Sequence, residues 1–131
     1  MVILITGKAG AGKTHWAMEW INEQKSKTAM ARPTVAWIDG DQFRAENNNR
    51  DFSEEGRFNN LQQAAKKAAK IEEQGMVVVC SFIAPTKELR EMMRGHWRES
   101  VLIYIPGGTL WEGTTYETPE WDEFNFRKGD N

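Results

Sequence analysis

The chain has 131 residues, a formal net charge of −2 and 40% hydrophobic residues. This length favours one domain over residues 1–131, large enough to bury about two-thirds of its unfolded surface. The slightly acidic balance argues against a nucleic-acid polymer as the main ligand, and no apolar run reaches membrane-spanning length. The single cysteine, Cys80, rules out an internal disulfide and is typical of a reducing compartment. We therefore expect a cytoplasmic protein that does not bind membranes.

The N-terminal segment carries a glycine-rich phosphate-binding motif. A short apolar run precedes residues 7–14, which read G-K-A-G-A-G-K-T and fit G-x-x-x-x-G-K-[ST]. The glycines let several backbone N–H groups face one anion, and the following helix adds the positive end of its dipole. Lys13 is expected to reach the β- and γ-phosphates of ATP, and Thr14 to bind Mg²⁺. The strand–loop–helix context disfavours the alternative, a glycine-rich turn without a ligand. The residues predicted to bind the nucleotide are Gly7, Gly10, Ala11, Gly12, Lys13 and Thr14.

Along the rest of the chain, apolar runs alternate with helical patterns. Nearly continuous apolar runs predict parallel strands, buried on both faces, over residues 2–6, 35–39, 76–81 and 101–105. Helices are predicted over 13–25, over 54–74 and from about 86 to 95, the second with Ser53 as N-cap and Gly75 after its end. This order predicts an α/β protein with a three-layer P-loop kinase fold, a mostly parallel sheet and helices on both faces. Periodicity ends at Pro106, which predicts an irregular tail over 106–131.

Polar residues follow the second and third predicted strands. Asp39 and Asp41 flank a glycine where the second strand should end, and Ser81 and Phe82 end the third. Ligands of such sheets bind beyond the carboxyl ends of the strands. Phosphoryl transfer needs a carboxylate that holds Mg²⁺ or accepts the proton of the attacking hydroxyl. By itself, the D-G-D motif is equally compatible with a loop whose aspartates face water.

The ordered series of motifs resembles the adenylylsulfate kinases (APS kinases). That family has D-G-D-x-x-R, F-S-x-E-D-R-x-x-N and S-F-I-S-P after the phosphate loop. This chain has D-G-D-Q-F-R at 39–44, F-S-E-E-G-R at 52–57 followed by Asn60, and S-F-I-A-P at 81–85. The resemblance covers roughly residues 2–95. It implies transfer of the γ-phosphate of ATP to the 3′-hydroxyl of adenylylsulfate.

The resemblance also implies roles for individual residues. Lys13, Asp39 and Asp41 would be catalytic, with Asp39 near the acceptor hydroxyl and the metal, and with Thr14 and Asp39 as metal ligands. Phe52 would stack on the substrate adenine, opposite Trp111. In some members the serine at the position of Ser81 is itself phosphorylated. The implied substrate-binding residues are Asp41, Arg44, Phe52, Arg57, Asn60, Ser81, Phe82, Ile83 and Trp111.

Structural alternatives stay open for several of these residues. Arg44 and Arg57 could instead form surface ion pairs with neighbouring glutamates. Phe52 could belong to the hydrophobic core. The aromatic residues of the tail could pack against the domain or contribute to a homodimer contact.

The chain departs from the family pattern at several positions and lacks one of its segments. Asp51 stands where the family has a glycine, and Gly56 where it has an aspartate. The arginine-containing lid expected after the fourth strand is missing, although such a lid excludes water and brings positive charge to the transferred phosphate. Lys8, Lys87 and Arg90 are the cations that could replace this charge. Two other hypotheses therefore remain: a kinase for another nucleotide, sugar or polynucleotide hydroxyl, and a nucleotide-binding relative without turnover.

Overall fold

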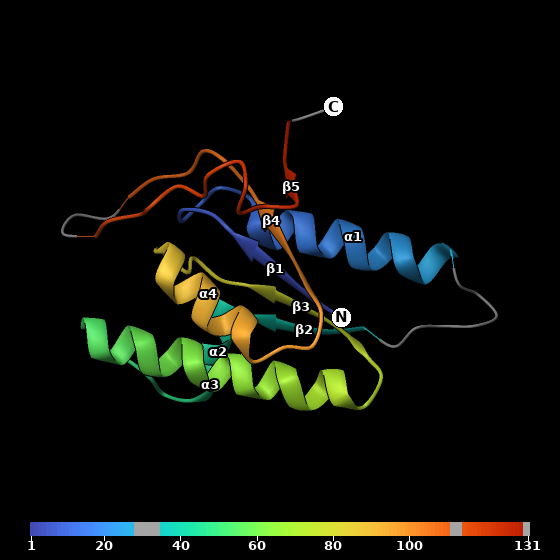
Figure 1. The fold of residues 1–131 in the computed structure, drawn as a ribbon, viewed down its shortest axis with the longest axis horizontal. Helices are drawn as coiled ribbons and strands as arrows, with labels where there is room; N and C mark the ends of the chain where they lie inside the picture. Colours follow the sequence, from blue (N-terminus) through green and yellow to red (C-terminus); the bar gives the residue numbers. More distant parts are fainter. Residues whose placement is uncertain (28–34, 111–113, 130–131) are drawn as a thin grey trace.

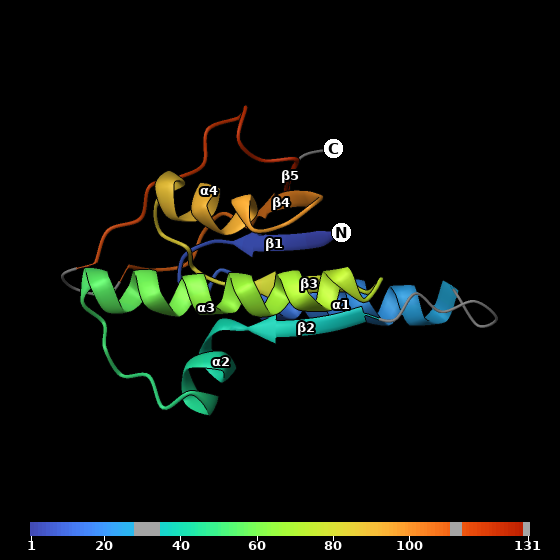
Figure 2. The ribbon, with the colours of Figure 1, turned by 60° about the horizontal axis from the view of Figure 1, so that its bottom comes forward.

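The computed structural model describes residues 1–27, 35–110 and 114–129. Within these ranges, a central sheet has the strand order β2-β3-β1-β4-β5, and every neighbouring pair is parallel (Figure 1). The strands are β1 (Val2–Thr6), β2 (Val35–Asp39), β3 (Val77–Ser81), β4 (Ser100–Tyr104) and β5 (Phe126–Arg127). Figure 2 shows β1, β2 and β4 pointing to the same side of the molecule.

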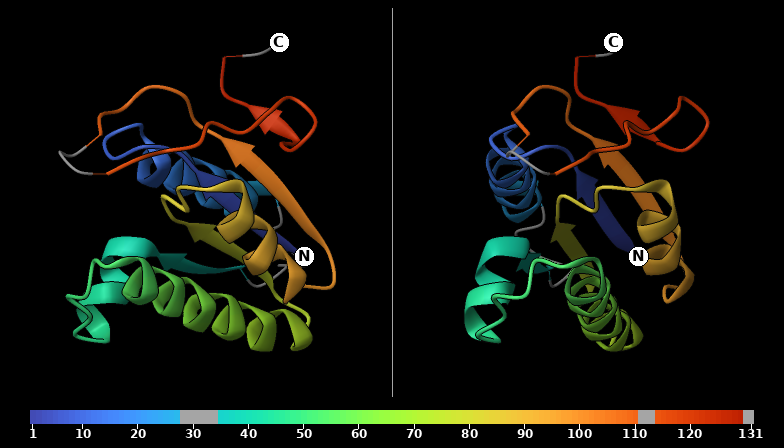
Figure 3. Two further views of the ribbon diagram at one scale, coloured as in Figure 1. Left: turned by 60° about the vertical axis from the view of Figure 1, so that its left-hand side comes forward. Right: turned by 90° about the vertical axis from the view of Figure 1, so that its left-hand side faces the viewer.

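Helices cover both faces of the sheet. Helix α1 (Lys13–Lys27) lies on one face, and α3 (Glu54–Glu73) and α4 (Lys87–Gly95) lie on the other (Figures 1 and 3). The short helix α2 (Gly40–Glu46) follows β2 directly. This arrangement confirms the predicted three-layer α/β architecture with a parallel sheet.

The central strand β1 shows why the apolar runs are continuous. Val2 and Leu4 belong to the core cluster beneath α3 and α4, whereas Ile3 and Ile5 belong to the cluster beneath α1. Because successive side chains of a strand point to opposite faces, a strand covered on both sides needs apolar residues throughout.

Hydrogen bonds at its two ends fix the limits of α3. The Ser53 hydroxyl accepts a hydrogen bond from the Gly56 N–H at 3.1 Å, which satisfies one of the free donors of the first turn. At the other end, Gly75 follows the C-cap residue with φ +86°. Both predicted helix ends are confirmed.

Helix α2 was not predicted from the sequence. Asp39 is its N-cap, and the carboxylate accepts a hydrogen bond from the Gln42 N–H at 3.3 Å. Phe43 then anchors the helix in the core. The D-G-D motif is therefore a strand–helix junction rather than an open loop.

The segment after β4 is fixed to the rest of the protein by polar contacts. The Tyr116 hydroxyl lies 2.9 Å from the Thr6 hydroxyl. Arg90 of α4 is fully buried; it donates hydrogen bonds to the Glu117 carbonyl at 2.9 Å and pairs with the Glu123 carboxylate.

Two further contacts complete the packing of the tail. Phe124 packs against the main core, and Phe126 of β5 lies 6.3 Å from Trp16 between ring centroids. Trp121, by contrast, is 82% exposed. The tail thus packs against the domain and adds a strand, β5, where irregular structure was predicted. No helix within the described residues is long and apolar enough to cross a membrane.

Candidate active site

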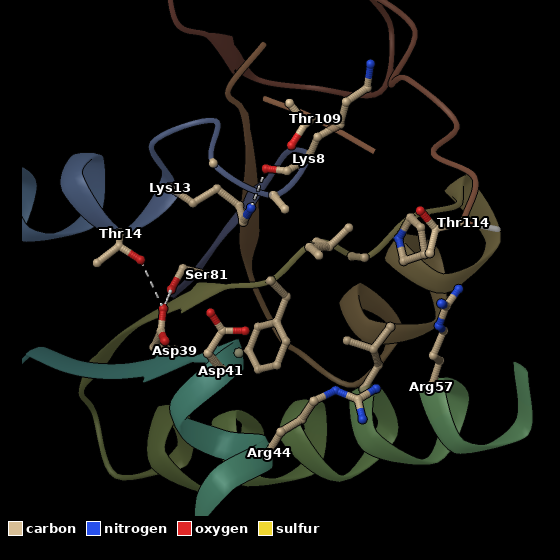
Figure 4. Close-up of a pocket in the computed structure, with 18 of the residues that line it drawn as sticks. Lys8, Lys13, Thr14, Asp39, Asp41, Arg44, Arg57, Ser81, Thr109 and Thr114 are labelled. Carbon is tan, nitrogen blue, oxygen red and sulfur yellow. Dashed lines mark hydrogen bonds between the residues drawn. The ribbon is translucent and has the colours of Figure 1, made fainter. Parts of the chain in front are cut away.

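A cavity of about 570 Å³ opens at the carboxyl ends of β1, β2 and β3. Its walls come from the glycine-rich loop, α2, the start of α3 and the segments that follow β3 and β4 (Figure 4). This is the position that the parallel topology predicts for a ligand.

The glycine-rich loop has the backbone shape of a phosphate cradle. Gly10 and Gly12 have φ of +74° and +104°, which side-chain-bearing residues rarely adopt. The Lys13 ammonium donates hydrogen bonds to the carbonyls of Gly7 at 2.9 Å and Lys8 at 2.8 Å. Burial lowers the pKa of Lys13, while Asp41 and Asp39 oppose this shift. A partly buried cation at the N-terminus of α1 fits the phosphates of a nucleotide.

Asp39 lies beside the loop and is held by several donors. Its Oδ1 atom accepts hydrogen bonds from the Ser81 hydroxyl at 2.9 Å and the Thr14 hydroxyl at 3.3 Å (Figure 4). Hard oxygens of this kind are what Mg²⁺ prefers, and protein-bound Mg²⁺ keeps further ligands from phosphate and water. No group of three His, Cys, Asp or Glu side chains able to hold a metal occurs among the described residues. A metal here would therefore be bound by the Asp39 and Thr14 side chains together with the nucleotide.

Two arginines line the opposite wall of the cavity. The Arg44 guanidinium donates hydrogen bonds to Asn49 Oδ1 and to the Asp51 carbonyl, both at 3.3 Å. The Arg57 guanidinium has no hydrogen-bond or ion-pair partner within the described part of the chain. Burial, followed by the charge of Arg57, lowers the pKa of Arg44. Two neighbouring cations at one cavity wall provide a site for an anion.

Phe52 is a surface residue of the cavity rather than a core residue. Its side chain is 53% exposed, which contradicts the core alternative. The Arg44 guanidinium lies 4.5 Å from the centre of its ring. This contact holds the ring from one side and also replaces the surface ion pairs considered for Arg44.

The remaining predicted substrate residues reach the cavity to different extents. Asp41, in the first turn of α2, lines the cavity with an exposed side chain. Asn60 and Phe82 line it from nearly buried positions, and Ile83 lines it with 38% of its surface exposed. Trp111 lies outside the described residues. Gly7 and Ala11 belong to the loop but are not among the residues that line the cavity.

The segment after β4 was expected at the site from its place beyond a strand end, but the residues of it that line the cavity were not predicted from the sequence. The segment after β4 crosses the glycine-rich loop, where the Thr109 N–H donates to the Ala9 carbonyl at 2.8 Å. The residues that line the cavity here are Thr109, Leu110, Thr114 and Thr115. They carry no periodic or compositional signal, so only the folded structure identifies them as cavity residues.

The three cations considered as substitutes for a lid have different environments. Arg90 is wrong for this role, because it is fully buried and paired with Glu123. Lys87 is not among the cavity-lining residues and lies 4.0 Å from Glu91. Lys8 lines the cavity, but its side chain extends away from Lys13 (Figure 4). None of these three cations is therefore placed to replace the charge of the lid.

Comparison with protein families gives a decisive match. The family model described as adenylylsulphate kinase matches residues 1–107 of the chain. The chain belongs to the adenylylsulfate kinase family. This confirms the resemblance found in the motifs and extends it beyond residue 95.

Curated relatives in this family are longer than the chain. The adenylyl-sulfate kinase of Bacteroides thetaiotaomicron is 31% identical over 93 residues, which make up 70% of this chain and 44% of the relative. That of Bacillus licheniformis is 33% identical over 94 residues, or 71% of this chain and 46% of the relative. The chain therefore spans less than half the length of these adenylylsulfate kinases.

Solved structures of adenylylsulfate kinases have the same fold. A cysteine-to-alanine mutant of the Mycobacterium tuberculosis APS kinase CysC superposes with a TM-score of 0.78 at 23% identity, covering 96% of this chain and 82% of that one. The same enzyme in complex with AMPPNP and APS has a TM-score of 0.71 at 24% identity, covering 79% and 61%.

Proposed function

We propose that this protein transfers the γ-phosphate of ATP to the 3′-hydroxyl of adenylylsulfate, giving 3′-phosphoadenylylsulfate. The observation that carries the proposal is the division of the cavity into two halves. The glycine-rich loop with Lys13 forms one wall, and Arg44, Arg57 and exposed Phe52 form the other. Membership of the adenylylsulfate kinase family supports the same reaction.

On the donor side, the loop N–H groups and Lys13 bind the β- and γ-phosphates. Thr14 and Asp39 would hold Mg²⁺, which would supply positive charge for the phosphate oxygens of the nucleotide. The hydrogen bonds from Ser81 and Gln42 keep the Asp39 carboxylate fixed beside the loop. Because these groups are already oriented, little reorganisation is needed when the nucleotide binds.

On the acceptor side, the arginines bind the anionic phosphosulfate and Phe52 stacks on the adenine. Asp41 lies on the same helix as Arg44 and lines the cavity between the two walls. Its carboxylate has no hydrogen-bond partner within the described ranges. It is therefore available, beside Asp39, to orient the acceptor hydroxyl and take up its proton.

A panel of acceptors tests the proposed reaction. The protein is incubated with Mg·ATP labelled in the γ-phosphate and with adenylylsulfate, other nucleotides, small sugars or 5′-hydroxyl oligonucleotides. We expect labelled phosphate on adenylylsulfate only. Transfer only to another acceptor would contradict the proposal, and tight ATP binding without transfer to any acceptor would indicate a non-catalytic relative.

Two phenylalanine variants test the acceptor half of the cavity. Phe52→Leu should weaken adenylylsulfate binding by about 1–3 kcal/mol, the usual contribution of a base stacked on an aromatic ring. Phe58→Leu is the matched control, because Phe58 is also exposed, at 39%, but is not a cavity residue. Equal adenylylsulfate affinity in the two variants would argue against stacking on Phe52.

A further inference from the structure

A hydrogen-bonded chain connects the edge of the sheet to the candidate active site. The Trp37 indole Nε1–H donates to the Ser81 hydroxyl oxygen at 2.9 Å, and that hydroxyl donates to Asp39 Oδ1 at 2.9 Å. Trp37 and Asp39 are two residues apart on β2, and Ser81 faces Asp39 across the β2–β3 pair. The pleat therefore places all three side chains on one side of the sheet.

The direction of these hydrogen bonds is fixed by chemistry. An indole N–H can only donate, and a serine hydroxyl has a single proton. Because Ser81 accepts from Trp37, its one proton is directed to the carboxylate of Asp39. Ser81 is only 2% exposed, so solvent offers it few alternatives.

We propose that Trp37 is a positioning residue for phosphoryl transfer, acting on Asp39 through Ser81. The inference rests on the proposed function, in which Asp39 and Thr14 hold the metal. Of the two hydroxyls that donate to Asp39 Oδ1, that of Ser81 is the closer, at 2.9 Å against 3.3 Å for Thr14. Ser81, oriented by Trp37, is therefore the side-chain donor that holds Asp39 Oδ1 at the shorter distance. Trp37 itself is not among the residues that line the cavity.

The series of hydrogen bonds from Trp37 to Asp39 can be tested without measuring turnover. In protein labelled with ¹⁵N at tryptophan, Trp37→Phe identifies the Trp37 indole signal by its loss. Ser81→Ala and Asp39→Ala should each shift that signal, because the first removes the acceptor of the indole N–H and the second removes the acceptor of the Ser81 hydroxyl. The signal of Trp20, which is half-buried in the cluster beneath α1, should stay in place and serves as reference. A Trp37 signal that does not respond to Ser81→Ala would overturn the proposal.

Kinetics test the effect on transfer. Trp37→Phe should lower kcat about tenfold, as is common for outer residues that orient metal ligands, with the KM for ATP changed less than twofold. The matched control Trp20→Phe should keep the wild-type kcat. The double variant Trp37→Phe/Ser81→Ala should be no slower than Ser81→Ala alone, since both changes interrupt the same series of hydrogen bonds. Additive losses, or an unchanged kcat in Trp37→Phe, would overturn the proposal.

The two tests separate this inference from the proposed function. If the wild-type protein transfers no phosphate to adenylylsulfate, the proposed function fails. The indole spectrum still decides whether Trp37 is coupled to Asp39, because it requires no substrate. Melting curves of all variants by circular dichroism show whether any loss of kcat reflects unfolding.

Discussion

Asp51 and Gly56 fit together at the start of α3. The Asp51 carboxylate accepts hydrogen bonds from the Ser53 N–H at 3.0 Å and from the Ser53 hydroxyl at 2.6 Å, and these bonds lower the pKa of Asp51. A Cβ atom on Gly56 would lie 2.5 Å from the Asp51 carbonyl oxygen and would collide with its carboxylate. The family pattern has glycine and aspartate at these positions in the reverse order, so the two departures compensate each other.

Gly56→Ala should therefore destabilise the protein by about 1–3 kcal/mol, the usual cost of a methyl group forced into filled space. Adding Asp51→Gly should recover part of this loss, because the carboxylate no longer occupies the space. Urea unfolding of the two variants and of Asp51→Gly alone measures the coupling. Equal stabilities of Gly56→Ala and wild type would contradict this steric account.

Tyr116 gives a residue-scale prediction about pH. Burial raises its pKa to about 12, above the ordinary value of 10.0. The folded state therefore holds this proton more tightly than the unfolded state. The resulting stabilisation is complete below pH 10 and is lost as the pH rises towards 12, by up to about 1.4 kcal/mol per pH unit.

Tyr116→Phe should cost about 1 kcal/mol at pH 7, because the hydrogen bond to Thr6 is lost. The difference in unfolding free energy between the two proteins should narrow above pH 10, since phenylalanine does not titrate. Denaturant unfolding at pH 7, 9 and 10.5 measures this difference. A gap that stays constant or widens with pH would show that Tyr116 is not the group responsible.

At the scale of elements, α4 and the tail are joined through the buried pair of Arg90 and Glu123. The Arg90 guanidinium also donates to the carbonyls of Ala84 at 2.8 Å and Glu117 at 2.9 Å. The single Arg90 side chain thus joins three parts of the protein: the residues that follow β3, helix α4 and the tail. Removing one partner of such a pair leaves a buried charge without compensation.

Glu123→Ala should accordingly destabilise the protein by about 3–5 kcal/mol. Glu120→Ala is the matched control, because Glu120 lies on the same segment and is exposed. Thermal unfolding followed by circular dichroism compares the two. Similar melting temperatures would show that the tail is not held by this pair.

At the scale of the whole molecule, helices on opposite faces of the sheet support the donor and acceptor walls of the cavity. Lys13 is the first residue of α1, whereas Arg57 belongs to α3 on the far wall. Because the two walls are supported by different elements, their contributions to binding should be separable.

Lys13→Ala should abolish ATP binding or reduce it severely and leave adenylylsulfate binding largely intact. Arg57→Ala should weaken adenylylsulfate binding by about 1–3 kcal/mol, the range for a lost charge-assisted hydrogen bond, without a comparable effect on ATP. Arg98→Ala, at an exposed position outside the cavity, controls for net charge. Calorimetric titrations with each ligand measure these effects. If both variants lost affinity for both ATP and adenylylsulfate, the division of the cavity into a donor and an acceptor wall would be contradicted.

Local patterns in the sequence were sufficient for strands β1 to β4 and for helices α1, α3 and α4. Strands β1 and β3 were predictable because burial on both faces requires uninterrupted apolar residues, and the start of α3 because Ser53 caps it locally. The glycine-rich loop was recognisable because one contiguous segment supplies the whole motif.

The contacts that fix the tail and the surroundings of the site depend on residues far apart in the sequence. Trp37 meets Ser81, Arg90 meets Glu123 and Thr109 meets Ala9 only because the sheet and the tail bring them together. Likewise β5 has only two residues and exists through its pairing with β4. The sequence by itself determined the layered fold and the phosphate loop, since these depend on periodicity and contiguous motifs. The tertiary structure decided which cations are buried, what forms the cavity wall and what orients Asp39, because those depend on long-range packing.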